Sequence, residues 1–358
     1  MQAIKINTAA PAPPQSAILL LYTGGTLGMQ LDERQGVLRP FDFAQILRNI
    51  PELSQLSCEI TVVSMPQLID SSNMQPAIWQ EMVQIIAHFY PDYDGFVILH
   101  GTDTMAYSAS ALSFMLENLQ KPLIFTGAQL PIGAIRTDAR QNILSSLEIA
   151  QARHPRGQVL VPEVCIFFND VLIRGNRAQK EESVLFDAFK SENYPYLAKA
   201  GVHIQYTHEA IAPCPTAPFA AHLALDNRVA LLKLFPGLRP EVLQALLQIP
   251  DLQGLVIETY GSGNAPTADW FLDSVRQALA RGLVILNISQ CLGGQVAQGR
   301  YETSVALREM GVVGGSDLTT EAAITKLMFL LGQKLPPEAL RAALAAPLRG
   351  EMTISPGE

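Results

Sequence analysis

Two short polar segments rich in glycine and threonine could carry out chemistry at a carbonyl carbon. Residues 23–28 read Thr-Gly-Gly-Thr-Leu-Gly, and residues 100–104 read His-Gly-Thr-Asp-Thr. Each segment follows an apolar, strand-like run, and open parallel sheets bind ligands outside the carboxyl ends of their strands. Glycine lets the backbone approach a ligand closely, and a threonine hydroxyl there can attack it or hydrogen-bond to it. The two segments are therefore predicted to form one site at one sheet edge, and not simple turns.

A threonine nucleophile needs a partner that accepts its proton, because a free hydroxyl is a weak nucleophile near neutral pH. No Ser/His/Asp arrangement is legible in the chain, so we look for a lysine working through Asp103. Lys180 follows the strand-like stretch 164–173 and could reach the same edge. Its spacing alone equally allows a solvated surface lysine, so both interpretations stay open at this point.

Several other kinds of site are disfavoured by the sequence. The chain has no G-x-x-x-x-G-K-[ST], no G-x-G-x-x-G after its first strand, no G-x-S-x-G and no H-E-x-x-H. The six histidines lack metal-ligand spacing, and the four cysteines are scattered without a C-x-x-C pair. We therefore expect no metal, no cofactor and no disulfide framework.

The composition is that of an ordinary globular protein and excludes a disordered, collagen-like or coiled-coil chain. Of the 358 residues, 48% are hydrophobic and 16% charged, and the net charge is −8. No Lys/Arg run exceeds two residues, which argues against nucleic-acid binding. No apolar stretch approaches the roughly 18 residues of a membrane span. Residues 7–16 read NTAAPAPPQS and lack the apolar core of a secretory signal, so we expect a cytoplasmic protein.

Short apolar runs alternate with amphipathic helical stretches, which predicts an α/β fold with parallel sheets. Three amphipathic helices are expected, each with one apolar face. The first face carries Leu112, Met115, Leu116 and Leu119, and the second carries Ile143, Leu147 and Ala150. The third carries Ile324, Leu327, Met328 and Leu331. The expected strands are 17–22, 60–63, 96–99, 122–125, 164–168, 229–234, 254–258 and 283–288.

The length favours two domains, and one segment breaks the alternation of strands and helices. Residues 207–222 contain three prolines and no periodicity, which is typical of a linker. We predict a Pro/Ala-rich leader at 1–16 and a larger, doubly wound catalytic α/β domain at 17–206. A linker at 207–228 and a smaller α/β domain at 229–358 complete the prediction.

Taken together, the Thr-Gly-Gly-Thr segment, the His-Gly-Thr-Asp-Thr-Met segment and the downstream lysine resemble the bacterial-type L-asparaginase (asparaginase/glutaminase) family. The similarity is greatest to its cytoplasmic type I branch and runs from about Ile18 to about Pro347. The matching stretches include 68–74, 93–119 and 260–266. The resemblance implies a tight homodimer, which can pair into a homotetramer, with each active site completed across the dimer interface. It also implies asparagine hydrolysis through a threonine-linked acyl-enzyme.

The resemblance also implies roles for individual residues. Thr26 corresponds to the nucleophile that becomes acylated, whereas Thr23 is expected to shape the loop. The activating trio corresponds to Thr102, Asp103 and Lys180. The amino-acid end of the substrate is expected at Asp70, Ser71 and Ser72, together with Thr102 and Asp103, and Asn264 corresponds to a residue supplied by the neighbouring subunit. Without the family resemblance, residues 70–73 would be interpreted as a simple Asx or Ser/Thr turn.

Two departures from the family pattern change what we expect. Val37 stands where relatives place a tyrosine on the flexible loop, and Tyr301 matches a C-terminal tyrosine that some members use instead. Glu258 stands where allosteric members carry an arginine that grips effector asparagine. An acidic residue there repels a carboxylate, so we expect weak or absent activation by asparagine.

Three alternative functions are left open by the sequence. A minor glutaminase activity is compatible with it, because one methylene gives only about 1–3 kcal/mol of discrimination. The amidotransferase subunit that acts on mischarged tRNA carries an additional N-terminal domain, which we do not expect in this chain. A non-catalytic amino-acid sensor would be expected to lack Thr26 or Lys180, and both are present.

Overall fold

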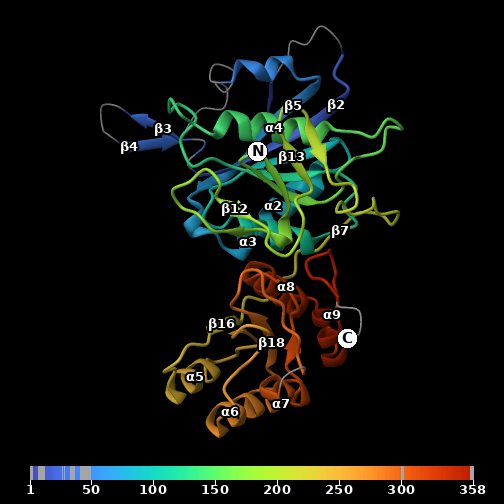
Figure 1. Cartoon of the computed structure of the whole chain (residues 1–358). Helices are drawn as coiled ribbons and strands as arrows, with labels where there is room; N and C mark the ends of the chain where they lie inside the picture. Colours follow the sequence, from blue (N-terminus) through green and yellow to red (C-terminus); the bar gives the residue numbers. More distant parts are fainter. Residues whose placement is uncertain are drawn as a thin grey trace. The chain divides into compact units, whose positions relative to one another are not determined.

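The computed structural model describes residues 3–6, 13–25, 27, 29–32, 37–40, 50–299 and 302–354. The chain divides into two compact units, Met1–Leu223 and Ala224–Glu358, coloured blue to yellow-green and yellow to red in Figure 1. This division falls within the predicted linker 207–228. The predicted domain boundaries themselves stay a prediction.

The first unit is built on a nine-stranded sheet in the order β1-β5-β2-β6-β8-β9-β10-β13-β14. The strands β5, β2, β6, β8 and β9 run parallel, and the remaining strands join antiparallel. The bounds are β1 (Ala3–Ile6), β2 (Ser16–Gly24), β5 (Cys58–Ile69), β6 (Gly95–Leu99), β8 (Leu123–Thr126), β9 (Val164–Phe168), β10 (Val171–Arg174), β13 (Ala198–Ala200) and β14 (Ile204–Tyr206). The predicted α/β fold is confirmed, and β1 is a strand that we did not predict within the 1–16 leader.

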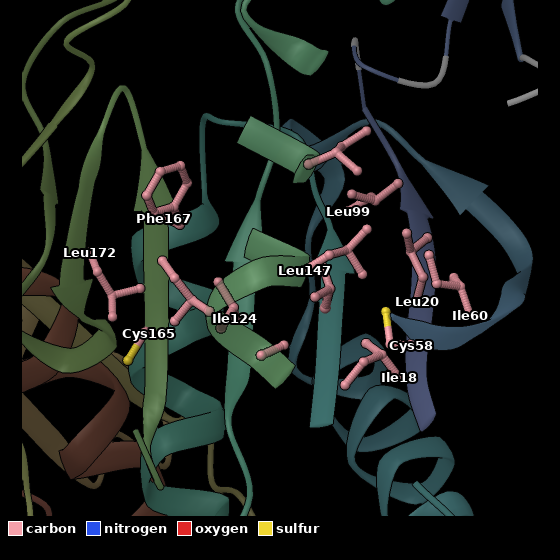
Figure 2. Packing of buried hydrophobic residues seen from close by; sticks show 14 of the residues in the cluster. Ile18, Leu20, Cys58, Ile60, Leu99, Ile124, Leu147, Cys165, Phe167 and Leu172 are labelled. Atoms are coloured by element: carbon pink, nitrogen blue, oxygen red, sulfur yellow. The ribbon is translucent and has the colours of Figure 1, made fainter. Parts of the chain in front are cut away.

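Both faces of this sheet are buried, which explains why its parallel strands are almost continuously apolar. On one face, Ile143 and Leu147 of α4 (Ala139–Gln151) pack against Leu20, Ile124 and other strand residues, as Figure 2 shows in part. On the opposite face, Phe96 stacks on Tyr90, which follows α2 (Pro76–Phe89). Alternate residues of each strand therefore enter different cores.

The helix expected to carry Leu112 through Leu119 ends earlier than its apolar spacing indicates. Helix α3 spans Met105–Met115, and β7 (Leu116–Glu117) pairs with β15 (Ala220–Ala221). Asn118 adopts a left-handed conformation with φ 54° and its side-chain amide donates to the Pro218 carbonyl. This residue turns the chain away from the helix, so Leu119 is buried outside it.

Shorter elements complete the first unit. They are the pair β3 (Met29–Asp32) and β4 (Val37–Pro40), the hairpin β11 (Gln179–Lys180) and β12 (Phe189–Lys190), and the 3-10 turns η3 (Pro51–Gln55), η4 (Ser71–Asn73) and η5 (Gly175–Arg177). The β11–β12 hairpin matters most for function, since it carries Lys180.

The second unit contains a four-stranded parallel sheet in the order β16-β17-β18-β19. Its elements are β16 (Val229–Lys233), α5 (Pro240–Leu247), β17 (Gly254–Thr259), α6 (Asp269–Ala280), β18 (Val284–Ser289), α7 (Glu302–Met310), β19 (Val313–Gly314), α8 (Thr320–Gly332) and α9 (Pro337–Ala345). Pro240 opens α5 and Gly332 ends α8, as predicted. In the part of the chain that the structure describes, no helix is long and apolar enough to cross a membrane.

Candidate active site

Three chain segments meet at the carboxyl edge of the first sheet, and glycine makes the contact possible. Gly25 follows β2 with φ +86°, and a Cβ built on it would lie only 2.6 Å from the Gly101 Cα. A Cβ built on Gly101 would in turn lie 2.4 Å from the Ser71 Oγ. Real side chains do not approach this closely, so glycine at both positions lets the segments after β2, β6 and β5 come together.

The Thr23 hydroxyl has a structural role. Thr23 is buried, and its Oγ1 donates a hydrogen bond of 2.9 Å to the Leu99 carbonyl at the end of β6. This bond joins the end of β2 to the end of the neighbouring strand β6. Thr26 itself lies outside the described residues, but the Leu27 carbonyl beside it accepts a hydrogen bond from the Ile132 N–H at 3.3 Å.

Lys180, Thr102 and Asp103 form a hydrogen-bonded cluster. The Lys180 Nζ donates to the Thr102 Oγ1 at 2.9 Å and to the Asp103 Oδ1 at 2.7 Å. The side chain of Lys180 is 17% exposed, whereas that of Asp103 is 61% exposed. The ammonium is therefore shielded and shared between a hydroxyl and a carboxylate, and the outer part of the carboxylate faces solvent. The hairpin brings Lys180 to Thr102 across 78 residues of sequence.

The segment 70–72 lies against this cluster. The Asp70 Oδ1 accepts hydrogen bonds of 3.0 Å from both the backbone N–H and the hydroxyl of Ser72, so Asp70 caps η4. The Thr104 Oγ1 donates to the Ser71 carbonyl at 2.8 Å. The local Asx turn is thus present, and it also belongs to the same edge as residues 100–104.

His100 belongs to a buried hydrogen-bond chain behind the cluster. The Trp79 Nε1 donates to the Ser108 Oγ at 2.9 Å, and the Ser108 Oγ lies 2.9 Å from the His100 Nε2. The His100 Nδ1 lies 2.6 Å from the Gly101 carbonyl, which can only accept, so Nδ1 carries the proton and Nε2 accepts from Ser108. Burial lowers the pKa of His100 from 6.5 to about 4. His100 is therefore neutral near pH 7 and positions the 100–104 segment.

Gln129 is a residue of this edge that our sequence analysis missed. It follows β8, and the Thr102 Oγ1 donates to the Gln129 Oε1 over a long 3.4 Å. The Gln129 Nε2 donates to the Leu185 carbonyl at 3.0 Å. The rule that pointed to the ends of the strands before residues 23 and 100 also applies to the strand at 122–125, and could have found Gln129.

Besides Thr26, two predicted site residues fall outside the described residues of the first unit. Tyr301 lies outside the described residues. Asn264 belongs to the second unit, where its backbone pairs with Tyr260 in an isolated bridge. Their roles, like those of the other site residues, stay predictions.

Glu258 is also in the second unit and is engaged by its neighbours. Its Oε1 accepts from the Thr320 hydroxyl at 2.6 Å, and its Oε2 lies 3.4 Å from the Lys233 Nζ. Burial, with a smaller contribution from Glu258, raises the pKa of Glu321 to about 7. At this corner of the unit, the Glu258 carboxylate is therefore engaged by one hydroxyl and one ammonium.

The described ranges contain no group of three or more His, Cys, Asp or Glu side chains arranged to hold a metal ion. The chemistry available at the edge in the first unit is that of hydroxyls, one ammonium and carboxylates.

Comparison with known proteins matches two family models to this chain. The model described as Asparaginase, N-terminal covers residues 17–212, and the model described as Glutaminase/Asparaginase C-terminal domain covers residues 228–344. L-asparaginase 1 of Escherichia coli K12 is 42% identical over 340 residues, which is 95% of this chain and 98% of that protein. The 60 kDa lysophospholipase of Mus musculus is 40% identical over 366 residues, covering 95% of this chain and 63% of that protein.

Among solved structures, L-asparaginase I from Vibrio cholerae matches with a TM-score of 0.85 and 39% identity, covering 95% of this chain and 99% of that one. Fold and matches together define a two-domain α/β protein of the type shared by asparaginases and glutaminases. The chain belongs to the asparaginase/glutaminase family, which confirms the resemblance inferred from its motifs.

Proposed function

We propose that this protein hydrolyses L-asparagine to L-aspartate and ammonia through an acyl-enzyme formed on Thr26. The observation that carries the proposal is the cluster in which Lys180 contacts both Thr102 and Asp103, at the edge that the Thr-Gly-Gly-Thr loop reaches. A hydroxyl nucleophile needs an adjacent group that manages its proton, and the lysine hydrogen-bonded to Thr102 is placed to supply and recover a proton in place of a histidine.

The substrate's two charged ends account for the acidic and hydroxyl groups of the site. Asp103 holds the α-ammonium through the exposed part of its carboxylate. The α-carboxylate lies against residues 70–72, where Asp70 orients Ser72 through its own hydrogen bonds and the Ser71 hydroxyl donates to the substrate, with Thr102 nearby. The carboxamide then lies towards Thr26 and Lys180.

The reaction proceeds in two balanced steps. The Thr26 oxygen forms a bond to the carboxamide carbon, the Lys180 ammonium gives a proton to the departing nitrogen, and the C–N bond breaks to release ammonia. The proton of the Thr26 hydroxyl passes through Thr102 and restores the Lys180 ammonium. Water then attacks the β-aspartyl ester, the ester C–O bond breaks, and a proton of that water passes to the Thr26 oxygen. Preorganised N–H donors stabilise the oxyanion in both steps.

The remaining assignments depend on the family relationship. We propose a homodimer in which Asn264 of the neighbouring subunit completes the site. Two such dimers can pair into a homotetramer. Tyr301 assists the nucleophile in place of the loop tyrosine that Val37 replaces. We also propose a cytoplasmic location and no requirement for a metal or cofactor.

The test is steady-state ammonia release from L-asparagine and from L-glutamine over a wide concentration range, with and without a chelator. The proposal predicts turnover of asparagine, a lower kcat/KM for glutamine and no effect of the chelator. A protein that releases no ammonia from asparagine, or that prefers glutamine, would contradict it.

A further inference from the structure

Gln129 stands between the proposed trio and a second cavity in the first unit. That cavity has a volume of about 470 Å³ and is lined by Gln129, Leu130, Arg136, Ser183, Val184, Leu185 and Phe186. Most of its lining is apolar, and it opens beside exposed Val184 and Leu185. The substrate roles proposed above do not use it.

The side chain of Gln129 is held at both ends. Its Nε2 donates to the Leu185 carbonyl at 3.0 Å, which directs its Oε1 towards the Thr102 hydroxyl at 3.4 Å. Its backbone N–H donates to the carboxylate of Asp138, which also accepts from the Leu130 N–H at 3.1 Å. The side-chain amide of Gln129 therefore forms a fixed wall of the cavity. Its Nε2 lies on the side of Leu185 and its Oε1 on the side of Thr102.

The position of Gln129 identifies which end of the substrate it faces. Its Oε1 accepts from the same Thr102 hydroxyl that accepts from Lys180, and this pair is proposed above to move the proton at the carboxamide. Three residues further on, the Ile132 N–H bonds to the carbonyl of Leu27, which follows the proposed nucleophile in the sequence. The amino-acid end of the substrate is assigned to residues 70–72, which are tied to Thr104. Gln129 therefore borders the carboxamide, from which the leaving nitrogen departs.

We propose, on the basis of the function proposed above, that Gln129 determines specificity for the leaving group by closing this cavity to the substrate. With Gln129 in place, the carboxamide nitrogen has room for hydrogens only, so the leaving group is ammonia. Without its side chain, the cavity admits an apolar substituent on that nitrogen. The volume suffices, since an apolar cavity of about 150 Å³ holds a benzene ring.

The chemistry of the substituted substrate is the same and balances in the same way. The nucleophile's oxygen bonds to the carbonyl carbon, the C–N bond breaks, and the nitrogen takes up the proton that the hydroxyl lost. N4-benzyl-L-asparagine therefore yields L-aspartate and benzylamine.

The experiment measures kcat/KM for N4-benzyl-L-asparagine relative to L-asparagine in wild type and variants. Gln129→Ala is expected to raise this ratio about tenfold or more, the range that a change in pocket size produces. Loss of the hydrogen bond between Gln129 and Thr102 affects both substrates, so its effect cancels in the ratio of the two kcat/KM values.

Three variants serve as controls. Gln129→Met keeps the length of the side chain and the wall, so the ratio stays at the wild-type value although both hydrogen bonds are lost. Arg136→Ala widens the cavity from an exposed position and leaves the wall intact, so it also leaves the ratio unchanged. Gln84→Ala, at an exposed position on α2, reports on nonspecific effects. If thermal unfolding shows that Gln129→Ala does not fold, Gln129→Ser replaces it.

The outcomes separate this inference from the proposed function. An unchanged ratio in a Gln129→Ala protein that still hydrolyses asparagine overturns the inference alone. The same holds if Gln129→Met raises the ratio as much as Gln129→Ala does. A wild type that releases no ammonia from asparagine overturns the proposed function, and the inference fails with it.

Discussion

At the scale of single residues, the hydroxyls and titratable groups of the edge fall into two kinds. Thr23 and His100 are buried and engaged with backbone carbonyls, so their polar atoms stabilise the edge. Lys180 and Asp103 keep part of their side chains open to solvent and can respond to a substrate. Burial and hydrogen-bond partners, and not residue type, distinguish the supporting groups from the candidate reactive ones.

The buried neutral state of His100 makes the stability of the protein depend on pH. Its pKa is about 4 in the folded chain and near 6.5 when unfolded, so the unfolded state binds the proton more readily. The contribution of the neutral His100 to the free energy of unfolding is fully present above pH 6.5. As the pH falls towards 4, the free energy of unfolding decreases by roughly 3 kcal/mol.

Chemical denaturation of wild type and His100→Gln at pH 7.5 and pH 4.5 tests this dependence. The variant has the lower free energy of unfolding at pH 7.5. At pH 4.5 the difference between the two proteins is smaller, because wild type has lost most of the contribution of neutral His100. Protonation of carboxylates affects both proteins equally and cancels in the difference. A difference in the free energy of unfolding that does not change with pH would show that His100 is not held neutral.

At the scale of elements, the site depends on how closely three strand ends approach one another. A Cβ built on Gly25 would lie 2.6 Å from the Gly101 backbone, so no side chain fits at position 25. The loop positions are therefore set by steric contact as much as by hydrogen bonds.

Gly25→Ala is expected to reduce kcat for asparagine at least about tenfold, because the added Cβ displaces the loop that carries the proposed nucleophile. Gly157→Ala is the matched control: it has a similar φ of +81° but nothing within 4 Å of the added Cβ. Both variants share the backbone strain of about 1 kcal/mol. Equal effects of the two substitutions on kcat would contradict a role for the Gly25–Gly101 contact.

The sequence predicted the parallel strands β2, β5, β6, β8 and β9 of the first sheet, the strands β16, β17 and β18 of the second, and the strand ends that carry the site, because buried parallel strands are recognisable as short apolar runs. It missed the antiparallel strands of the first sheet and the two-residue β19 of the second. It did not predict the end of α3, since the apolar spacing continues to Leu119 while Asn118 breaks the helix through a left-handed turn bonded to Pro218. From its spacing alone, Lys180 could equally be a site residue or a solvated surface lysine. Its contact with Thr102 depends on a hairpin whose position is set by tertiary structure.

At the scale of the whole molecule, the two units make separate contributions that composition does not reveal. The net charge of −8 says nothing about the substrate, whose proposed recognition depends on a few placed groups in the first unit. The second unit holds Glu258 between Lys233 and Thr320. The family resemblance implies an arginine at this position in allosteric members. Regulation is the property most affected by this substitution.

We predict a hyperbolic dependence of rate on asparagine concentration, without activation by a second asparagine molecule. The Glu258 carboxylate accepts from Thr320 and pairs with Lys233, so this ammonium is already engaged and does not hold the α-carboxylate of an effector. Initial rates over a wide range of asparagine concentrations provide the measurement. A sigmoidal curve that becomes hyperbolic when Glu258 is replaced would refute this prediction.

The central claim is that the Thr26 hydroxyl attacks the carboxamide, and the most direct measurement is steady-state ammonia release by Thr26→Ala beside Thr23→Val. Loss of the nucleophile should lower kcat by about 10³-fold or more. Thr23→Val should cost stability through its lost bond to the Leu99 carbonyl and keep turnover within about tenfold of wild type. Near-wild-type turnover in Thr26→Ala, or a loss confined to Thr23→Val, would contradict the account.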